Sequence, residues 1–138
     1  MAALNRLTKY EPDPYWGYCV EYSNPETGGQ VLPTMSFTMQ LLKPGQRTLP
    51  HRHTSSSVYT CVSGKGVTTV EGKRLEWGKN DIFVVPSWMW HEHENLGGEN
   101  AVLFAVSDTV AIQTLGLYRE EGKSPAGEIV PLVHPSHK

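Results

Sequence analysis

The segment GQRTLPHRHTSSSVYTCVSG, residues 45–64, carries two histidines one residue apart, His51 and His53, in a stretch typical of a β-strand. A second pair with the same spacing, His91 and His93, follows later in the chain. Side chains of a strand alternate between its two faces, so the members of each pair share a face. If both pairs face the interior of one barrel, four imidazoles converge there. Imidazole binds Fe, Zn, Cu and Ni, and three histidines with open coordination positions are typical of a catalytic metal site.

From residue 34 onward, short segments rich in β-branched and aromatic residues follow one another, and turn-forming residues separate them. This regular alternation of short strand-like segments and turns favours an all-β sandwich or barrel. The predicted strands, besides the stretch of the first histidine pair, are residues 34–42, 58–62, 66–70, 73–76, 81–85, 90–94, which holds the second pair, and 101–107.

The chain divides into three expected parts. Residues 1–33 are rich in Pro, Gly, Asn and Tyr and predict an irregular N-terminal arm with at most one short strand, at 18–22. Residues 34–108 are the predicted barrel core. Residues 109–138 are expected to hold one helix, at 109–117 with Asp108 as its N-cap, and a tail that packs loosely or against a partner subunit.

Composition excludes several classes of protein. The chain has 138 residues, which suits one domain with a real core, and a formal net charge of −2 gives no electrostatic case for nucleic-acid binding. No apolar run approaches the ~20 residues that a membrane helix needs, and the N-terminus lacks the apolar core of a secretory signal. Two cysteines, Cys19 and Cys61, do not make a disulfide framework. We expect a cytoplasmic protein with free thiols and no membrane partner.

Two stretches resemble the paired motifs of the cupin superfamily, whose fold is a jelly-roll β-barrel. The first motif, G-x5-H-x-H-x3-E-x6-G, fits residues 45–64 at every spacing, but Ser57 stands where the family's glutamate ligand lies. The second, G-x5-P-x-G-x2-H-x3-N, fits residues 80–95, but Asn80 and Trp88 replace its two glycines. The resemblance implies an all-β fold, a single-domain cupin with an N-terminal arm and one short C-terminal helix.

A narrower resemblance, over about residues 22–121, is to gentisate 1,2-dioxygenases and their salicylate and 1-hydroxy-2-naphthoate relatives. Those enzymes are usually two-cupin chains that bind Fe(II) through three histidines, lack the glutamate ligand and cleave an aromatic ring with O2. This chain is one cupin and looks more like their C-terminal half. The strings that carry the resemblance are PHRHTSS (50–56), FVVPSWMWHEH (83–93), AVLF (101–104) and LGLYREE (115–121).

The motif spacing and the resemblance point to His51, His53 and His91 as metal ligands. The resemblance implies Fe(II) as the cofactor, and the same ligands would also accept Zn, Ni or Mn. Three neutral imidazoles with Ser57 in place of a carboxylate leave a divalent ion with a charge of about +2, which favours an anionic, chelating substrate. The alternative is that the histidine pairs are polar residues on a sheet face.

His93 shares the face of His91 and is the predicted catalytic residue, an acid or base near O2 or a substrate hydroxyl. The alternative is a buried histidine hydrogen-bonded to a neighbour. The predicted substrate-binding residues are Tyr59, Trp90 and Gln40. Tyr59 stands where the ring-cleaving relatives commonly carry an arginine for the substrate carboxylate.

Trp90 and Trp88 point away from His91 by alternation, and they form either an aromatic wall for a planar substrate or ordinary packing. Arg52 also alternates outward, and we expect it to make a salt bridge at the surface or between subunits. Arg47 and Arg119 are further candidates for contact with an anion.

Three functions fit these features. The first is an enzyme, an Fe(II)-dependent dioxygenase that acts with O2 on a small hydroxylated aromatic substrate. The second is a non-catalytic cupin module for binding or oligomerisation, equivalent to the C-terminal half of a two-cupin dioxygenase. The third is a metal cupin with another reaction, such as an isomerase or a lyase. In each case we expect a homodimer or higher homo-oligomer, because exposed sheet edges need cover, with residues 1–33 and 122–138 as the covering segments.

Overall fold

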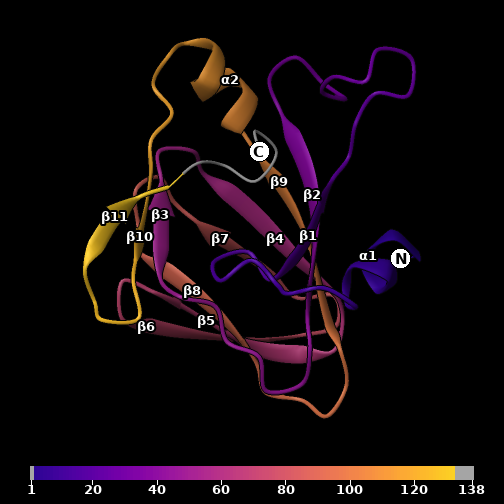
Figure 1. Ribbon diagram of the computed structural model, residues 1–138, viewed down its shortest axis with the longest axis vertical. Coiled ribbons are helices and arrows are strands. Elements are labelled where there is room, and N and C mark those ends of the chain that lie inside the picture. Colours follow the sequence, from indigo (N-terminus) through magenta and orange to yellow (C-terminus); the bar gives the residue numbers. More distant parts are fainter. Residues whose placement is uncertain (1, 133–138) are drawn as a thin grey trace.

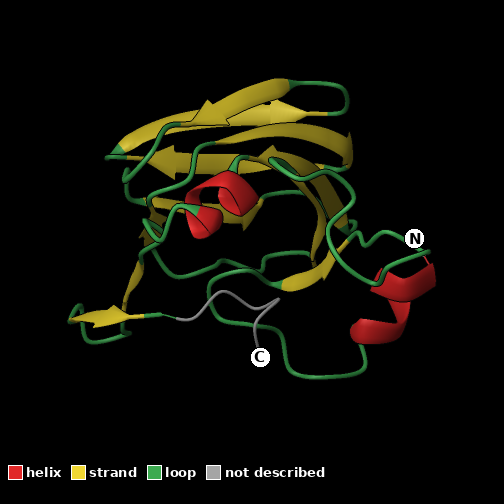
Figure 2. Ribbon diagram, turned by 90° about the horizontal axis from the view of Figure 1, so that it is seen from above, coloured by secondary structure: helices red, strands yellow, loops and turns green. Residues whose placement is uncertain are grey.

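Two antiparallel sheets face each other in the computed structural model, which describes residues 2–132 (Figure 1, Figure 2). One sheet has five strands in the order β1 (Tyr18–Glu21), β2 (Ser36–Leu42), β9 (Ala101–Ser107), β4 (Ser57–Ser63) and β7 (Ile82–Val85). The other has six, in the order β11 (Ile129–Pro131), β10 (Glu120–Lys123), β3 (His51–His53), β8 (His91–Asn95), β5 (Lys65–Val70) and β6 (Lys73–Gly78). The prediction of an all-β jelly-roll barrel is therefore confirmed.

Alternation along the strands builds the interior. In β4, Tyr59 and Cys61 are buried while the intervening positions face outward, and Leu103 of β9 packs with them. The opposite sheet contributes Trp77 to the same cluster, but most of its inward positions are polar. Buried polar groups generally need a hydrogen-bond partner or a ligand, so the polar atoms of this face that lack a protein partner indicate where a ligand would bind.

Two short helices flank the sheets. The N-terminal helix α1 (Ala2–Leu7) was not expected; its Leu4 is 1% exposed and packs against Tyr18, Leu41 and Val102. A helix this short is marginal by propensity, so tertiary burial accounts for it.

The C-terminal helix α2 (Thr109–Thr114) ends earlier than predicted, because Gly116 adopts φ +73 just after the last turn. The carboxylate of Asp108 accepts no cap bond from the helix. It instead accepts a hydrogen bond from the backbone N–H of Ser56 at 2.8 Å.

Of the two expectations for the tail, loose packing is wrong as far as residue 131, and packing against a partner subunit stays a prediction. Strand β10 pairs antiparallel with β3, placing Glu120 opposite His53 and Gly122 opposite His51, and β11 continues the sheet. Strand β1 of the arm likewise pairs with β2. Both segments thus extend the sheets of their own chain, with β1 and β11 as outer strands, and their role between subunits stays a prediction. Residues 133–138 of the predicted tail lie outside the described residues.

Asn80 and Trp88, which replace the two glycines of the second motif, both adopt the left-handed backbone conformation that glycine favours. Asn80 has φ +73 and Trp88 has φ +64. Asparagine tolerates this left-handed region, but for a tryptophan it costs about 1–2 kcal/mol. The Trp88 ring is covered by guanidinium groups, with the Cζ of Arg52 at 4.1 Å and that of Arg119 at 5.4 Å from the ring centroid. These cation–π contacts offset part of that cost.

Both cysteines are free thiols, as predicted: Cys19 is half-buried and Cys61 is buried. Across residues 2–132, the structure contains no helix with the length and apolar character needed to span a membrane.

Candidate metal centre

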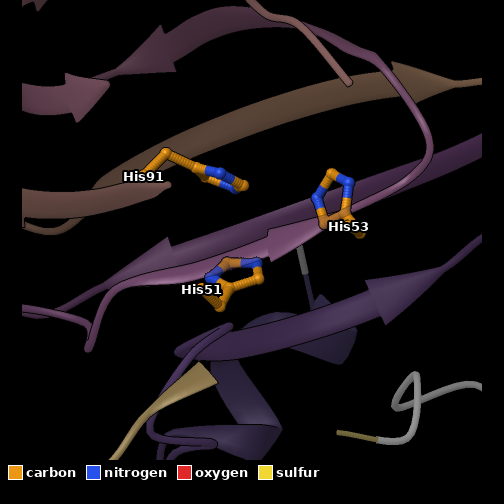
Figure 3. Close-up of side chains that lie close together, drawn as sticks. All are labelled: His51, His53 and His91. Carbon is orange, nitrogen blue, oxygen red and sulfur yellow. The ribbon is translucent and has the colours of Figure 1, made fainter. Parts of the chain in front are cut away.

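Three histidines meet on the inner face of the six-stranded sheet. Strands β3 and β8 are neighbours, and their register places His51 directly opposite His91. His53 lies two residues along β3, so its ring points to the same side. The ring centroids of His51 and His91 are 4.3 Å apart and those of His53 and His91 5.0 Å. Figure 3 shows the three side chains directed into one region between the strands, and one nitrogen of each lies within 4.8 Å of the others.

The ring nitrogens that meet there lack protein partners. His51, His53 and His91 are at most 1% exposed, and the Nε2 atom of each has no hydrogen-bond partner within residues 2–132. A buried polar atom without a partner costs about 1–3 kcal/mol. Three such atoms pointing at one another form a donor set that suits a divalent transition metal, because imidazole is a preferred ligand of those ions. The residues present therefore fit a metal ion.

The second nitrogen of two of these rings is anchored. His91 Nδ1 lies 3.0 Å from the carbonyl oxygen of Met89, and His53 Nδ1 lies 2.9 Å from that of Ser55. A carbonyl only accepts, so each Nδ1 donates its proton and leaves a lone pair on Nε2. The Ser55 hydroxyl, 3.0 Å from the same nitrogen of His53, adds a second contact. A metal-ligating histidine almost always has such an outer partner.

Burial also keeps the rings uncharged. Desolvation is the main cause that lowers the pKa of His51 and His91 well below 6.5, and the neighbouring imidazoles add to it. Burial likewise lowers the pKa of His53, and it lowers that of His93 to about 4. A neutral imidazole is the form that binds a metal, so the site is ready for an ion at neutral pH.

His93, the predicted catalytic residue, lies beside the three histidines but is held differently. Its ring centroid is 5.8 Å from that of His91, and Tyr59 packs edge-on against it at 5.1 Å. Its Nδ1 contacts the hydroxyl of Thr68 at 2.8 Å, and its Nε2 has no partner within the described residues. The catalytic role of His93 stays a prediction, and the structure places its ring beside that of His91.

Two of the three predicted substrate-binding residues lie inside the barrel. Tyr59 is 1% exposed and Gln40 is 2% exposed; the Gln40 side-chain oxygen is buried without a partner in the described part of the chain. Trp90 lies instead on the outer face, where its ring contacts the cations of Arg52 at 4.5 Å and Lys123 at 4.7 Å. The structure thus brings Tyr59 and Gln40, but not Trp90, to the histidine side.

The three arginines considered in the sequence, Arg47, Arg52 and Arg119, also lie away from the histidines. Arg52 forms a salt bridge with Glu121 within the chain, at 2.7 Å. Arg47 is 61% exposed and pairs with Glu92 at 3.0 Å. Arg119 is 71% exposed and lies 3.9 Å from the other oxygen of Glu121.

An aromatic wall over the histidines, formed by Trp16, was not predicted from the sequence. The Trp16 ring stacks on His53 at 5.9 Å and tilts over His51 at 5.0 Å between centroids. A turn presents it, because Asp13 Oδ1 accepts hydrogen bonds from the backbone N–H groups of residues 15 and 16. The Trp16 indole N–H donates to the buried carboxylate of Glu120 at 3.1 Å, and the Tyr118 hydroxyl donates to the same carboxylate at 2.8 Å.

A model described as Cupin domain matches residues 38–107. The 5-aminosalicylate 1,2-dioxygenase of Comamonas sp. is 46% identical over 83% of this chain and 30% of its own length. Gentisate 1,2 dioxygenase 1 of Aquipseudomonas alcaligenes is 43% identical over 86% of this chain and 34% of its own. The crystal structure of salicylate 1,2-dioxygenase from Pseudoaminobacter salicylatoxidans superposes with a TM-score of 0.81 at 26% identity, covering 89% of this chain and 35% of that one. The chain spans about a third of the length of these relatives.

We expect His53→Ala to abolish metal binding and to leave the barrel folded. The substitution removes one of three nitrogen donors, and the surrounding strands do not depend on an ion for their pairing. The measurement is Ni(II) titration by calorimetry, with far-UV circular dichroism to check the fold. The matched control is His93→Gln, which changes an equally buried histidine and should retain the metal. Equal affinity in His53→Ala and the unmodified chain would contradict the assignment of this ligand.

The metal-free protein should lose stability as the pH falls from 6.5 toward 4. An unfolded histidine takes up a proton near pH 6.5, but burial lowers the pKa of His93 to about 4 in the folded chain. The unfolded state therefore binds more protons in this window, and the free energy of unfolding decreases as the pH decreases. His93 alone would contribute about 3 kcal/mol across the window.

Urea unfolding of the metal-free chain at pH 7.5, 6 and 5 measures this loss. The His93→Gln variant should lose part of the slope, since it lacks one of the four titrating groups. A free energy of unfolding that is constant over this range would show that the imidazoles are not held neutral by burial.

Proposed function

The chain belongs to the cupin family, and on this premise we propose that it is a metal-dependent, ring-cleaving dioxygenase that uses O2 on a hydroxylated aromatic acid. The observation that carries the proposal is the meeting of three buried histidine Nε2 atoms in a possible ligand cluster that, among residues 2–132, includes no carboxylate oxygen. Relatives named as 5-aminosalicylate and gentisate dioxygenases support the class of reaction. They are about three times as long, so activity of this single cupin is itself part of the proposal.

Fe(II) is the proposed cofactor, with His51, His53 and His91 as its protein ligands. When bound there, the ion would supply Lewis acidity and electron exchange with O2, which no side chain of this chain offers. Zinc, nickel or manganese would fit the same nitrogens, so the choice of iron rests on the resemblance of the sequence to gentisate 1,2-dioxygenases. Ser57, buried at the position of the usual glutamate ligand, brings no negative charge to the site. An anionic substrate would then offset the charge of the ion.

The chain's own side chains would bind and orient that substrate. Gln40 offers a side-chain oxygen without a partner among the described residues, which can accept a hydrogen bond from a hydroxyl or amine. Burial raises the pKa of Tyr59, so its phenol stays neutral and can donate a hydrogen bond. Trp16 presents a flat ring beside His51 and His53, suited to stacking on an aromatic acid.

A second candidate function, a non-catalytic cupin module, is favoured by one observation. The position where the ring-cleaving relatives commonly carry an arginine holds Tyr59, and Arg47 and Arg119 are exposed on the outside of the barrel. A phenol binds a carboxylate more weakly than a bidentate guanidinium does. Without that arginine, a dioxygenase would have to hold the carboxylate of its substrate mainly through the metal ion, whereas a non-catalytic module has no such requirement.

Anaerobic loading with Fe(II), followed by metal analysis and O2 uptake, separates these functions. We expect about one iron per chain and O2 consumption on gentisate, salicylate or 1-hydroxy-2-naphthoate. His93→Ala should keep the iron and lose turnover, while the control Thr69→Val, on the outer face, should keep both. Absence of retained metal would favour the non-catalytic module. Retained metal without O2 uptake would point to another metal-cupin reaction, such as that of an isomerase or a lyase.

We also propose that the chain forms a homodimer or a higher homo-oligomer. The outer face of β4 and β7 exposes Val58 at 43%, Ile82 at 67% and Val84 at 51%, and β7 is the edge of its sheet. Apolar edge strands generally need cover. Light scattering at micromolar concentration should give a multiple of the chain mass, and Ile82→Lys with Val84→Lys should reduce it to one. Glu76→Lys, at the exposed edge of the other sheet, is the control; a monomeric unmodified chain would contradict the proposal.

A further inference from the structure

A chain of hydrogen bonds ends on His93. The indole Nε1 of Trp77, on β6, lies 2.9 Å from the hydroxyl of Thr68, and this hydroxyl lies 2.8 Å from His93 Nδ1. Sheet register builds the arrangement, because Thr68 on β5 lies directly opposite His93 on β8. Thr68 is 0% exposed and Trp77 4% exposed, so water does not compete for these groups.

The direction of these bonds follows from the chemistry of their atoms. An indole nitrogen only donates, so Trp77 donates to the oxygen of Thr68. The hydroxyl proton of Thr68 then has one acceptor within the described residues, His93 Nδ1. If His93 instead donated to Thr68, that proton would be buried without an acceptor, which is costly. His93 Nδ1 therefore accepts, and the proton of the neutral ring lies on Nε2.

This pattern is the reverse of that at His91. The Nδ1 of His91 faces a carbonyl, the oxygen of Met89, and must donate to it, so its Nε2 holds a lone pair. Two histidines on one face of one strand thus present opposite groups to the centre of the barrel. His91 presents an acceptor that can ligate a metal, and His93 presents an N–H that cannot.

We infer that Thr68, oriented by Trp77, is a positioning residue that fixes His93 as a hydrogen-bond donor at Nε2. The consequence is that His93 stays out of the ligand set and directs its N–H at an anionic oxygen of the bound substrate. The contact of the His93 N–H with the substrate rests on the proposed function and deepens it. The hydrogen-bond direction does not rest on it, and it exists in the metal-free chain. Thr48 supports the same residue from the backbone side, because its hydroxyl accepts from the His93 backbone N–H at 2.9 Å.

The test is a long-range proton–nitrogen NMR correlation on the metal-free full chain, labelled with nitrogen-15 in histidine, at pH 7.5. His93→Gln assigns the resonances of residue 93. We expect His93 to show a protonated Nε2 and an unprotonated Nδ1, and His91 to show the reverse. A protonated Nδ1 in His93 of the unmodified chain would overturn the inference, and this result needs no variant to fold.

Thr68→Val keeps the shape of the side chain and removes its hydroxyl. The Nδ1 resonance of His93 should then move toward that of a nitrogen that accepts no hydrogen bond, and Thr68→Ser should restore it. Thr69→Val, the outward neighbour on the same strand, should leave the spectrum unchanged. An unchanged Nδ1 resonance in folded Thr68→Val would overturn the role of Thr68.

Two further readouts separate this inference from the proposed function. Ni(II) affinity should not fall in Thr68→Val, because His51, His53 and His91 are unaltered. Turnover of the iron-loaded Thr68→Val variant should fall through kcat, with Thr68→Ser recovering it. If the chain binds no metal or consumes no O2, the proposed function fails while the NMR result for His93 still stands or falls by itself.

Discussion

Burial of four uncharged imidazoles on one sheet face is the constraint on which the rest of the structure depends. A charged ring in this interior would carry a large desolvation cost, so each histidine stays neutral and keeps one unprotonated nitrogen. The barrel accepts this polar face because the opposite sheet supplies an apolar one, built around Tyr59, Cys61 and Leu103. The same burial that disfavours a second proton on the rings leaves a lone pair of His51, His53 and His91 available to a metal ion. The burial of these side chains thus affects both the stability of the barrel and its ability to bind a metal ion.

The sequence predicted the barrel and the shared face of the histidines, because both depend on local periodicity. Alternation places His51 and His53 together whatever the rest of the chain does, and the predicted strand 101–107 matches β9. Strand β10 was missed because its residues, EEGK, lack β-branched and aromatic side chains. Its place in the sheet comes from pairing with β3, a long-range contact that no local pattern reports.

The wall over the histidines could not be predicted for a related reason. Trp16 lies in an arm whose composition indicates irregular structure, and Glu120 lies near the other end of the chain. Their hydrogen bond joins residues 104 positions apart. A buried carboxylate is rare unless it is paired, so alternation of polarity along residues 118–122 would have suggested a surface strand. Thr68 was missed likewise, since a threonine in a strand is common and only the register with His93 gives it a role.

The outer face of the same sheet has a consequence for how related sequences vary. Trp88 occupies a backbone position that favours glycine, and Arg52, which lies between the two histidines of β3, covers its ring. The contact between the Arg52 guanidinium and the Trp88 indole therefore offsets part of the backbone cost at residue 88. Among homologous chains, the two positions should covary: those with glycine at position 88 are free of the need for a cation at position 52. Substitutions at these two outer positions would leave the side chains of the inner face unchanged. The sequence can therefore diverge on one face of a strand while the histidines on the other face are preserved.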